Sequence, residues 1–434
     1  MSLEIKKVAV LGTGVMGSQI AAHLTNANIE VYAFDISQEV AEKGIEECKK
    51  IKPGPFYNIK SSKLITPLNY DEHLDKINEC DWIVEVISER LDWKHDLYKK
   101  ILPHINDNCI ITSNTSGLSL KSLSKDLPDN FLDKFFITHF FNPPRYMKLV
   151  EIISSSKTSK DLVKVMDSFL TDVLGKNVVH AKDTPNFIAN RIGVYGMMVT
   201  LHESKKRKLS IEDVDAITGT LIGRPKSATF RTADVVGLDT MCFVANTAYN
   251  DCPDDPEREI FKLPDYIQKM IDNKWLGQKS KQGFYKKIDK GVIHSLDLDS
   301  MEYKPMNKNK YSAFTIAKEN TYLEDRLNAV VRVDDVAGEF LWVCFAKSLA
   351  YSANLLGTIA DDVISIDNAM KGGFGWELGP FEVLDAIGIE YFVDRCKNEN
   401  IKLPEWLINI SKNNAKSIYT YIDGIKHSYD FKIN

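Results

Sequence analysis

The stretch "VAVLGTGVMGSQIAAHL", residues 8–24, joins an apolar strand pattern to a helical pattern through a glycine-rich turn. Its glycines have the spacing G-x-G-x-x-G. In a strand–turn–helix unit the first makes the turn, the second lets the backbone approach a pyrophosphate, and the third lets the helix pack on the strand. The helix N-terminus adds free N–H groups and partial positive charge. The stretch therefore predicts a dinucleotide site with first contacts from Gly12, Gly14, Val15, Met16 and Gly17.

The next strand pattern, "IEVYAFD" (29–35), ends on an acidic residue, Asp35. Asp35 follows the glycine turn at roughly the 20-residue spacing of dinucleotide folds, where a carboxylate accepts a hydrogen bond from the ribose 2′-hydroxyl. A carboxylate there would repel a 2′-phosphate. NAD is therefore the expected cofactor, in preference to NADP.

Strand and helix patterns alternate up to about residue 180. Short runs rich in Val, Ile and aromatic residues lie at 6–12, 29–35, 81–87 and 109–114. This alternation predicts an α/β domain over residues 1–182, with a doubly wound, mostly parallel sheet of the Rossmann class. The run "KFFITHFFNPPRYMKLVEII" (134–153) holds two more strand patterns. The proline corner between them is too short for a helical crossover, so they are expected to form a hairpin.

Two helical blocks follow, at 183–288 and 321–434, and the polar, aperiodic residues 289–320 between them are expected to form a linker. The first block is expected to begin near Asp183 or Thr184 as N-cap, with Pro185 in the first turn. The blocks resemble each other at a near-constant offset: "FRTADVVGLD" (230–239) recurs as "FEVLDAIGIE" (381–390), and Asp183 and Asp215 recur as Asp335 and Asp367. Several matches in register predict two all-α domains that are tandem copies. The second copy is expected to be structural, because Trp342 stands at the offset of Asn190.

The composition is that of an ordinary globular protein, with 44% hydrophobic and 26% charged residues. A formal net charge of −5 argues against nucleic acid or an acidic membrane as partner. The seven cysteines are scattered without a CxxC pair, which predicts reduced thiols, a cytoplasmic location and no metal site. The lysine-rich run "KKIKPGPFYNIKSSK" (49–63) is either a solvated face or one anion-binding site.

Polar side chains follow the later strand patterns, at the sheet edge where open α/β sheets bind ligands. Glu89 comes after 81–87, with Lys94 one turn into the next helix, and Asn114 and Ser116 come at and after the end of 109–114. These residues either contact a ligand or cap the following helix.

His139 and Glu151 stand in the two strands of the expected hairpin. A corner of that length can bring the carboxylate beside the imidazole. There it would fix the tautomer and stabilise the imidazolium, and the other ring nitrogen would be left to exchange a proton with a substrate. The alternative is a buried, satisfied His–Glu pair without chemistry. Beside a dinucleotide motif the pair is better explained as the base that alcohol oxidation by NAD requires.

Five motifs together, "GTGVMG…FD", "SNTSGLSL", "HFFNPPRYMKLVEII", "KDTPNFIANRIG" and "GQKSKQGFYKK", resemble the L-3-hydroxyacyl-CoA dehydrogenase family in order and spacing through residue 288. The second helical block resembles the duplicated C-terminal domain of that family. The resemblance implies interconversion of 3-hydroxyacyl-CoA and 3-oxoacyl-CoA, with His139 as base and Glu151 as its partner. It further implies that Ser116 and Asn190 hold the substrate oxygen and that NAD is bound by Glu89, Lys94, Ser116, Asn142 and Lys279.

The chain departs from the family pattern after residue 48. The segment that forms a long helical hairpin over the coenzyme A in the family is shorter here and is interrupted by Pro53, Gly54 and Pro55. By similarity, CoA contacts are expected from Cys48, Lys49 and Lys52. The length of the acyl chain is left open, so the substrate belongs either to 3-hydroxybutyryl-CoA metabolism or to β-oxidation. The oligomeric state is also left open, between a monomer and a homodimer.

Three alternatives remain open. A related β-hydroxyacid dehydrogenase would use a Lys-based mechanism, which the His–Glu corner argues against. A non-catalytic NAD-binding module would bind the cofactor without turnover. The chain also resembles the dehydrogenase portion of enzymes that carry an enoyl-CoA hydratase, so a hydratase or a thiolase is a candidate partner.

Overall fold

The computed structural model describes residues 4–307, 309–413, 417–423 and 425–428. The chain divides into two compact units, Met1–Phe187 and Ile188–Asn434. Within the described residues, no helix has both the length and the apolar character needed to cross a membrane.

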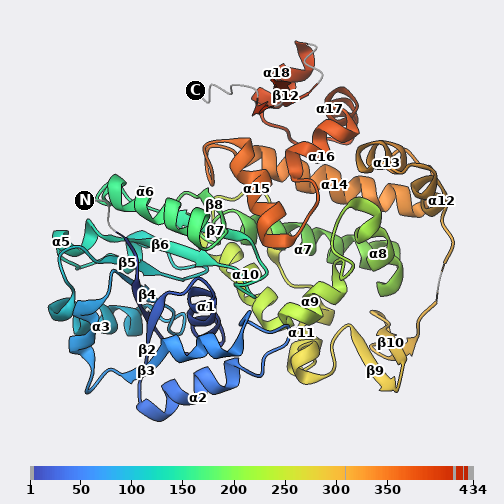
Figure 1. The fold of residues 1–434 in the computed structure, drawn as a ribbon. Helices are drawn as coiled ribbons and strands as arrows, with labels where there is room; N and C mark the ends of the chain where they lie inside the picture. Colours follow the sequence, from blue (N-terminus) through green and yellow to red (C-terminus); the bar gives the residue numbers. More distant parts are fainter. Residues whose placement is uncertain (1–3, 308, 414–416, 424, 429–434) are drawn as a thin grey trace. The chain divides into compact units, whose positions relative to one another are not determined.

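Unit 1 is built on an eight-stranded sheet of order β3-β2-β1-β4-β5-β6-β7-β8, drawn in blue to green in Figure 1. All neighbouring strands are parallel except β6 and β7, which pair antiparallel as expected for the hairpin. The strands are β1 Lys7–Leu11, β2 Glu30–Asp35, β3 Ile65–Asn69, β4 Trp82–Glu85, β5 Ile110–Ser113, β6 Phe135–Phe140, β7 Leu149–Ile153 and β8 Asn177–His180. The predicted doubly wound sheet is confirmed, and its order reverses between β1 and β4, where such sheets bind their ligands.

Helices follow most of these strands in sequence, although β6 leads directly into β7 and only a 3₁₀ turn lies between β3 and β4. The helices are α1 Val15–Asn26, α2 Gln38–Cys48, α3 Leu91–Ile101, α4 Leu120–Leu123, α5 Asp129–Leu132 and α6 Lys160–Ser168, which continues as a π-helical turn, Phe169–Val173. Short 3₁₀ turns occupy Ile59–Leu64, Leu74–Glu79 and Leu102–His104. One buried core joins α1, α2 and α6 to alternate residues of the sheet, such as Val8 and Val10. The rings of Tyr98, Phe131 and Phe135 pack together where α3 and α5 meet β6.

Strand β3 is not among the strands expected from the sequence. It lies at the edge of the sheet, paired only with β2, and contains Pro67. Proline cannot donate to a ladder and is tolerated at an edge, but it weakens the strand pattern in the sequence.

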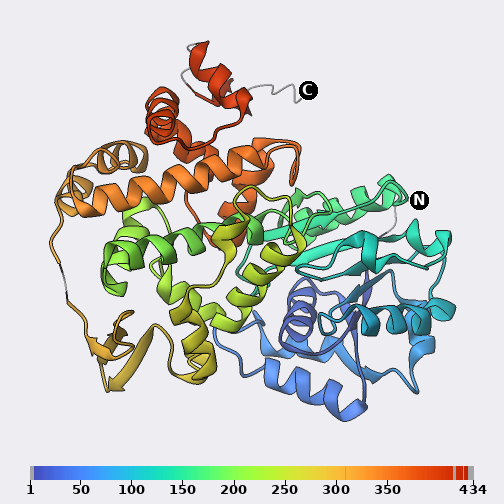
Figure 2. The same cartoon turned by 180° about the vertical axis from the view of Figure 1, so that it is seen from behind.

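Unit 2 is mostly helical. Its helices are α7 Ala189–Arg207, α8 Ile211–Thr218, α9 Phe230–Val236, α10 Leu238–Asp251, α11 Asp265–Asp272, α12 Ser312–Glu319, α13 Leu323–Val330, α14 Val336–Asn354, α15 Val363–Phe374, α16 Pro380–Ile387, α17 Ile389–Asn398 and α18 Glu405–Lys412. Further 3₁₀ turns are Thr220–Ile222, Arg258–Phe261 and Gln278–Ser280. Figure 2 shows these helices from behind, in light green to red.

The expected linker over 289–320 is wrong as a description of structure. These residues complete a three-stranded antiparallel sheet, β9 Tyr285–Asp289, β10 Val292–Leu296 and β11 Tyr303–Pro305, and then form α12. The strands are short and only the last two residues of β10 are buried, so they carry little apolar alternation for the sequence to reveal. A second small sheet pairs β12 Tyr419–Ile422 with β13 Ile425–Ser428.

The start of α7 also differs from the expectation. Asn186 and Phe187 have positive φ (64° and 51°), which interrupts a helix, and α7 begins at Ala189. The Asp183 carboxylate caps a different helix: it accepts the backbone N–H groups of Leu120 (2.7 Å) and Lys121 (2.9 Å) at the start of α4.

One hydrogen-bond arrangement occurs twice in unit 2. Asp215 and Asp367 each accept backbone N–H groups at the start of a later helix and a tyrosine hydroxyl at 2.7 Å. Asp234 and Asp385 each accept two backbone N–H groups at the start of the strand that carries the tyrosine, which is β9 for Asp234 and β12 for Asp385. The tyrosines are Tyr285 and Tyr419.

Candidate active site

The glycine turn between β1 and α1 is built as a close-approach site. Gly12 has φ +107°, and a Cβ there would lie 2.9 Å from the Val86 oxygen, while one at Gly17 would lie 1.9 Å from the Gly12 oxygen. At Gly14, no heavy atom of the described residues beyond the immediate chain neighbours lies within 4 Å of such a Cβ. Gly12 and Gly17 are therefore required by the turn itself, while the surface over Gly14 is open. Val15 is 65% exposed beside it at the start of α1, where N–H groups receive a phosphate.

Asp35 lies at the carboxyl end of β2 and is held by the glycine turn. Both the backbone N–H and the hydroxyl of Thr13 donate to Asp35 Oδ2 at 2.7 Å, and Ile36 N–H donates to Oδ1 at 2.8 Å. This fixes the carboxylate and leaves acceptor capacity on Oδ1, which fits a ribose hydroxyl. The open turn and the fixed carboxylate together fit a dinucleotide.

The sequence did not point to two residues that support this site, Thr13 and Gly44. A Cβ at Gly44, in the middle of α2, would lie 2.4 Å from the Thr13 oxygen, so only glycine lets α2 approach the turn. A single glycine inside a helix was the available signal for that contact.

His139 and Glu151 face each other across the β6–β7 ladder, where they are direct register partners. Their side chains meet at 2.7 Å, His139 Nδ1 to Glu151 Oε2, with His139 5% exposed and Glu151 fully buried. The rings of Phe141 and Phe187 lie 4.5 Å and 5.7 Å from the imidazole centroid. The pair therefore sits in an apolar surrounding, where a charge-assisted hydrogen bond is strengthened.

Two asparagines join the ends of the elements around this pair. Asn114 Oδ1 accepts the Phe140 N–H at 2.8 Å, next to His139, and Asn142 Oδ1 accepts from Gln19 Nε2 of α1 at 3.1 Å. The end of β5, the end of β6 and the first turns of α1 are thus held together, as a site at the switch point of the sheet requires.

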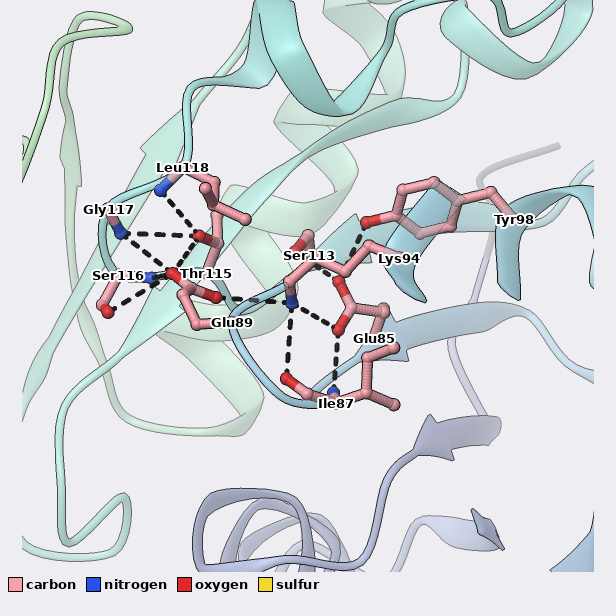
Figure 3. A network of polar contacts seen from close by, with 10 residues as sticks. All are labelled: Glu85, Ile87, Glu89, Lys94, Tyr98, Ser113, Thr115, Ser116, Gly117 and Leu118. Atoms are coloured by element: carbon pink, nitrogen blue, oxygen red, sulfur yellow. Dashed lines mark hydrogen bonds and ion pairs between the residues drawn. The ribbon is translucent and has the colours of Figure 1, made fainter. Parts of the chain in front are cut away.

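Glu89 and Ser116 also meet (Figure 3). Glu89 Oε1 accepts the backbone N–H groups of Ser116 (2.9 Å) and Gly117 (3.1 Å) and the Thr115 hydroxyl. Burial by itself raises the pKa of Glu89, but the Lys94 ammonium and these loop donors outweigh burial, and the pKa lies below its ordinary value. Glu89 is therefore a carboxylate that shapes the loop after β5.

Lys94, an expected cofactor contact, lies inside unit 1 between two carboxylates. The residue is 1% exposed, and its Nζ lies 2.6 Å from Glu85 Oε1 and 3.5 Å from Glu89 Oε2. The helix α3 points this side chain inward, so its charge is neutralised inside unit 1. The sequence did not point to Glu85.

The CoA contact expected from Cys48 is contradicted. Cys48 is fully buried in the core against α1, and its Sγ lies 3.3 Å from the backbone carbonyl oxygen of Ser18. Burial raises the pKa of the thiol to about 11. It lies on the inner face of α2, as the buried positions Ala41 and Ile45 do. Lys49 pairs with Glu46, and Lys52 is exposed.

Two expected site residues belong to unit 2. Asn190 is the second residue of α7 and is partly exposed. The Lys279 ammonium pairs with the Asp239 carboxylate. Among the described residues, no group of three or more His, Cys, Asp and Glu side chains is arranged to hold a metal ion.

Comparison with known proteins identifies the family of this chain. Residues 7–184 match the model of the 3-hydroxyacyl-CoA dehydrogenase NAD binding domain, and residues 187–287 match that of the 3-hydroxyacyl-CoA dehydrogenase C-terminal domain. The chain is 43% identical, over 99% of its length, to a probable 3-hydroxyacyl-CoA dehydrogenase of Bacillus subtilis. It is 34% identical, over 94% of its length, to a putative fatty acid oxidation complex trifunctional enzyme of Rickettsia felis. It spans 57% of the length of each of these relatives.

The fold is also similar to that of a solved 3-hydroxybutyryl-CoA dehydrogenase from Escherichia coli. The TM-score is 0.70 at 21% identity, with 95% of this chain and 99% of that one covered. The chain belongs to the 3-hydroxyacyl-CoA dehydrogenase family, and NAD is the cofactor of its N-terminal unit.

Proposed function

We propose that the protein interconverts (S)-3-hydroxyacyl-CoA and 3-oxoacyl-CoA, with His139 as general base and acid and Glu151 as its orienting partner. The observation that carries this proposal is the buried 2.7 Å contact between His139 Nδ1 and Glu151 Oε2 at the end of β6, in the unit that binds NAD. When bound, NAD supplies the hydride acceptor or donor.

The proton moves through His139. With Nδ1–H donated to Glu151, Nε2 carries the lone pair that takes the proton of the 3-hydroxyl during oxidation. In the reverse direction the imidazolium, stabilised by the Glu151 carboxylate, returns that proton to the oxygen at C3. Ser116 and Asn190 are proposed to donate hydrogen bonds to this oxygen, where negative charge develops.

The substitution His139→Gln tests the assignment. It removes the base and keeps side-chain volume, so turnover of acetoacetyl-CoA with NADH should be abolished while the dissociation constant for NAD stays near the wild-type value. Continued turnover would refute the role of His139. Absence of turnover in the wild-type protein, despite NAD binding, would favour the alternative of a non-catalytic NAD-binding module.

The substrate is proposed to be an acyl-CoA, with Lys49 and Lys52 near its phosphates. The printed name of the Rickettsia relative supports a role in fatty-acid oxidation. Rates across 3-hydroxyacyl-CoAs of four to sixteen carbons, with NAD and NADP, would separate a 3-hydroxybutyryl-CoA enzyme from a β-oxidation enzyme of broad range. NAD contacts are further proposed from Glu89, Asn114, Ser116, Asn142 and Lys279.

The surrounding assembly is a separate proposal. The name "trifunctional enzyme" in the Rickettsia relative supports a multienzyme context, with an enoyl-CoA hydratase or thiolase as partner. The cysteines are free, and all but the half-buried Cys252 are buried, which supports a reducing, cytoplasmic setting.

The two helical blocks, 183–288 and 321–434, are proposed to be tandem copies. The doubled arrangement around Asp215 and Asp367 supports this proposal. The second copy has Trp342 at the offset of Asn190, and its indole N–H donates to Glu399, so this copy is assigned a structural role. Since α7 and α14 belong to one chain, the second copy could cover the surface of the first in a monomer, with a homodimer as the alternative.

A further inference from the structure

A fully buried carboxylate, Glu85, ends strand β4 within a network of polar contacts (Figure 3). Its Oε1 accepts the Ile87 N–H at 2.8 Å and contacts Lys94 Nζ at 2.6 Å. Its Oε2 accepts the Ser113 hydroxyl at 2.6 Å and the Tyr98 hydroxyl at 2.9 Å. Four donors from β5, α3 and the turn after β4 satisfy this carboxylate, as a charge without solvent requires.

Lys94 connects Glu85 to Glu89. Its ammonium lies between the two carboxylates, 2.6 Å from Glu85 and 3.5 Å from Glu89, and it also lies 3.4 Å from the Ile87 carbonyl oxygen. Two negative groups thus share one buried cation. The short contact to Glu85 determines where the ammonium sits, and the longer contact to Glu89 responds to that position.

Glu89 in turn determines the conformation of the loop that carries Ser116. Its Oε1 accepts the N–H groups of Ser116 and Gly117 and the hydroxyl of Thr115. The Thr115 hydroxyl oxygen in turn accepts the Leu118 N–H at 3.0 Å. A change in the position of this carboxylate would therefore release several backbone groups of the loop together.

We propose that Glu85 is a positioning residue: by holding Lys94 it fixes the Glu89 carboxylate, and Glu89 fixes the Ser116 loop against which NAD binds. Without the Glu85 charge, Lys94 has Glu89 as its remaining anionic partner and draws that carboxylate away from the loop. The inference rests on the proposed assignment of Glu89 and Ser116 to the cofactor site. A role limited to joining β4 to α3 is the competing explanation, because buried ion pairs also serve packing.

The test is a double-substitution cycle on the dissociation constant for NAD, measured by titration without an acyl-CoA. Glu85→Gln is isosteric and removes only the charge. It should weaken NAD binding about tenfold or more, since hydrogen bonds to charged groups have this weight. In a Glu89→Gln background the same substitution should have little further effect, because the path from Glu85 to the loop is already broken.

Thr112→Val is the matched control. Thr112 precedes Ser113 in β5, is buried, and accepts from Trp82 Nε1 at 2.9 Å and from the Thr138 hydroxyl at 2.8 Å. The control also removes a buried polar group from the sheet, but that group has no contact with Glu89. It should lower the melting temperature and leave the dissociation constant for NAD unchanged.

Two outcomes would overturn the proposal: equal losses of NAD affinity from Glu85→Gln with and without Glu89→Gln, or a loss no larger than that of Thr112→Val. If Glu85→Gln does not fold, Glu85→Asp gives the same cycle: it keeps the charge, but the carboxylate is one methylene shorter and holds the Lys94 ammonium at another position. The readout is cofactor binding alone, so failure of the His139 assignment would leave this result interpretable.

Discussion

Replacing Glu151 by Gln isolates what the carboxylate does for His139. The substitution preserves size in a fully buried position and removes one negative charge 2.7 Å from His139 Nδ1. The amide oxygen could still accept from Nδ1–H. Its NH₂ group could instead donate to Nδ1, which would place the proton on Nε2 and leave no lone pair there for the substrate.

The expected loss in kcat has two contributions. A charge-assisted hydrogen bond contributes about 1.5–3 kcal/mol, which corresponds to roughly 10- to 150-fold in rate. Misorientation of the imidazole adds to this, and in Ser-His-Asp triads the equivalent Asp→Asn change lowers kcat about 10⁴-fold. Because both side chains lie away from solvent here, we expect Glu151→Gln to lower kcat by at least about 100-fold, with little change in the dissociation constant for NAD.

The assay is the oxidation of NADH by acetoacetyl-CoA, followed by absorbance, with folding checked by circular dichroism. Asp167→Asn is the matched control: it removes the carboxylate of the other His–carboxylate pair in unit 1, in which His180 Nε2 lies 3.0 Å from Asp167 Oδ2 and the imidazole is exposed. The control should keep wild-type kcat. A folded Glu151→Gln protein with kcat equal to that of the control would refute the orienting role of Glu151.

Three further predictions concern the cofactor site and the proline corner. Gly17→Ala should lower the free energy of unfolding by about 1–3 kcal/mol or more, because the new Cβ meets the Gly12 oxygen, whereas Gly14→Ala should unfold like the wild type in urea and bind NAD more weakly. Asp35→Ala should reduce the preference for NAD over NADP by about 10- to 100-fold, measured as the ratio of the two kcat/KM values, since it removes one charged acceptor. Burial lowers the pKa of Lys176, whose ammonium donates to the Met147 carbonyl, from 10.5 to about 8. Between these two pH values the unfolded chain binds more protons than the folded one, so the free energy of unfolding should rise with pH in this window, and Lys176→Met should abolish that rise.

The sequence predicted the parts of the fold that depend on local spacing. The glycine turn, β1, β2, β4 and β5 appear where their patterns stand, because turn residues and apolar runs act through neighbours in the chain. The hairpin pattern also predicted the meeting of His139 and Glu151. A short corner fixes the register of β6 and β7, and that register places the two residues opposite each other.

The misplaced polar side chains share one cause, which is that the partner of a polar group can be distant from it in the sequence. Asp183 looked like the N-cap of the next helix but caps α4, while Asp335, at the corresponding offset in the second block, does cap its own helix α14. Cys48 was expected to contact the substrate, but α2 directs its side chain toward the core.

The sequence by itself determined the cofactor class, the strand ends that carry polar residues, and the identity of the His–Glu pair. Only the tertiary structure decided which charges are buried and what neutralises them. Lys94 shows the physical reason. Its position one turn into α3 could be read from the sequence, but its partner Glu85 lies at the end of β4, and the two meet only when helix packs on sheet and solvent is excluded from both.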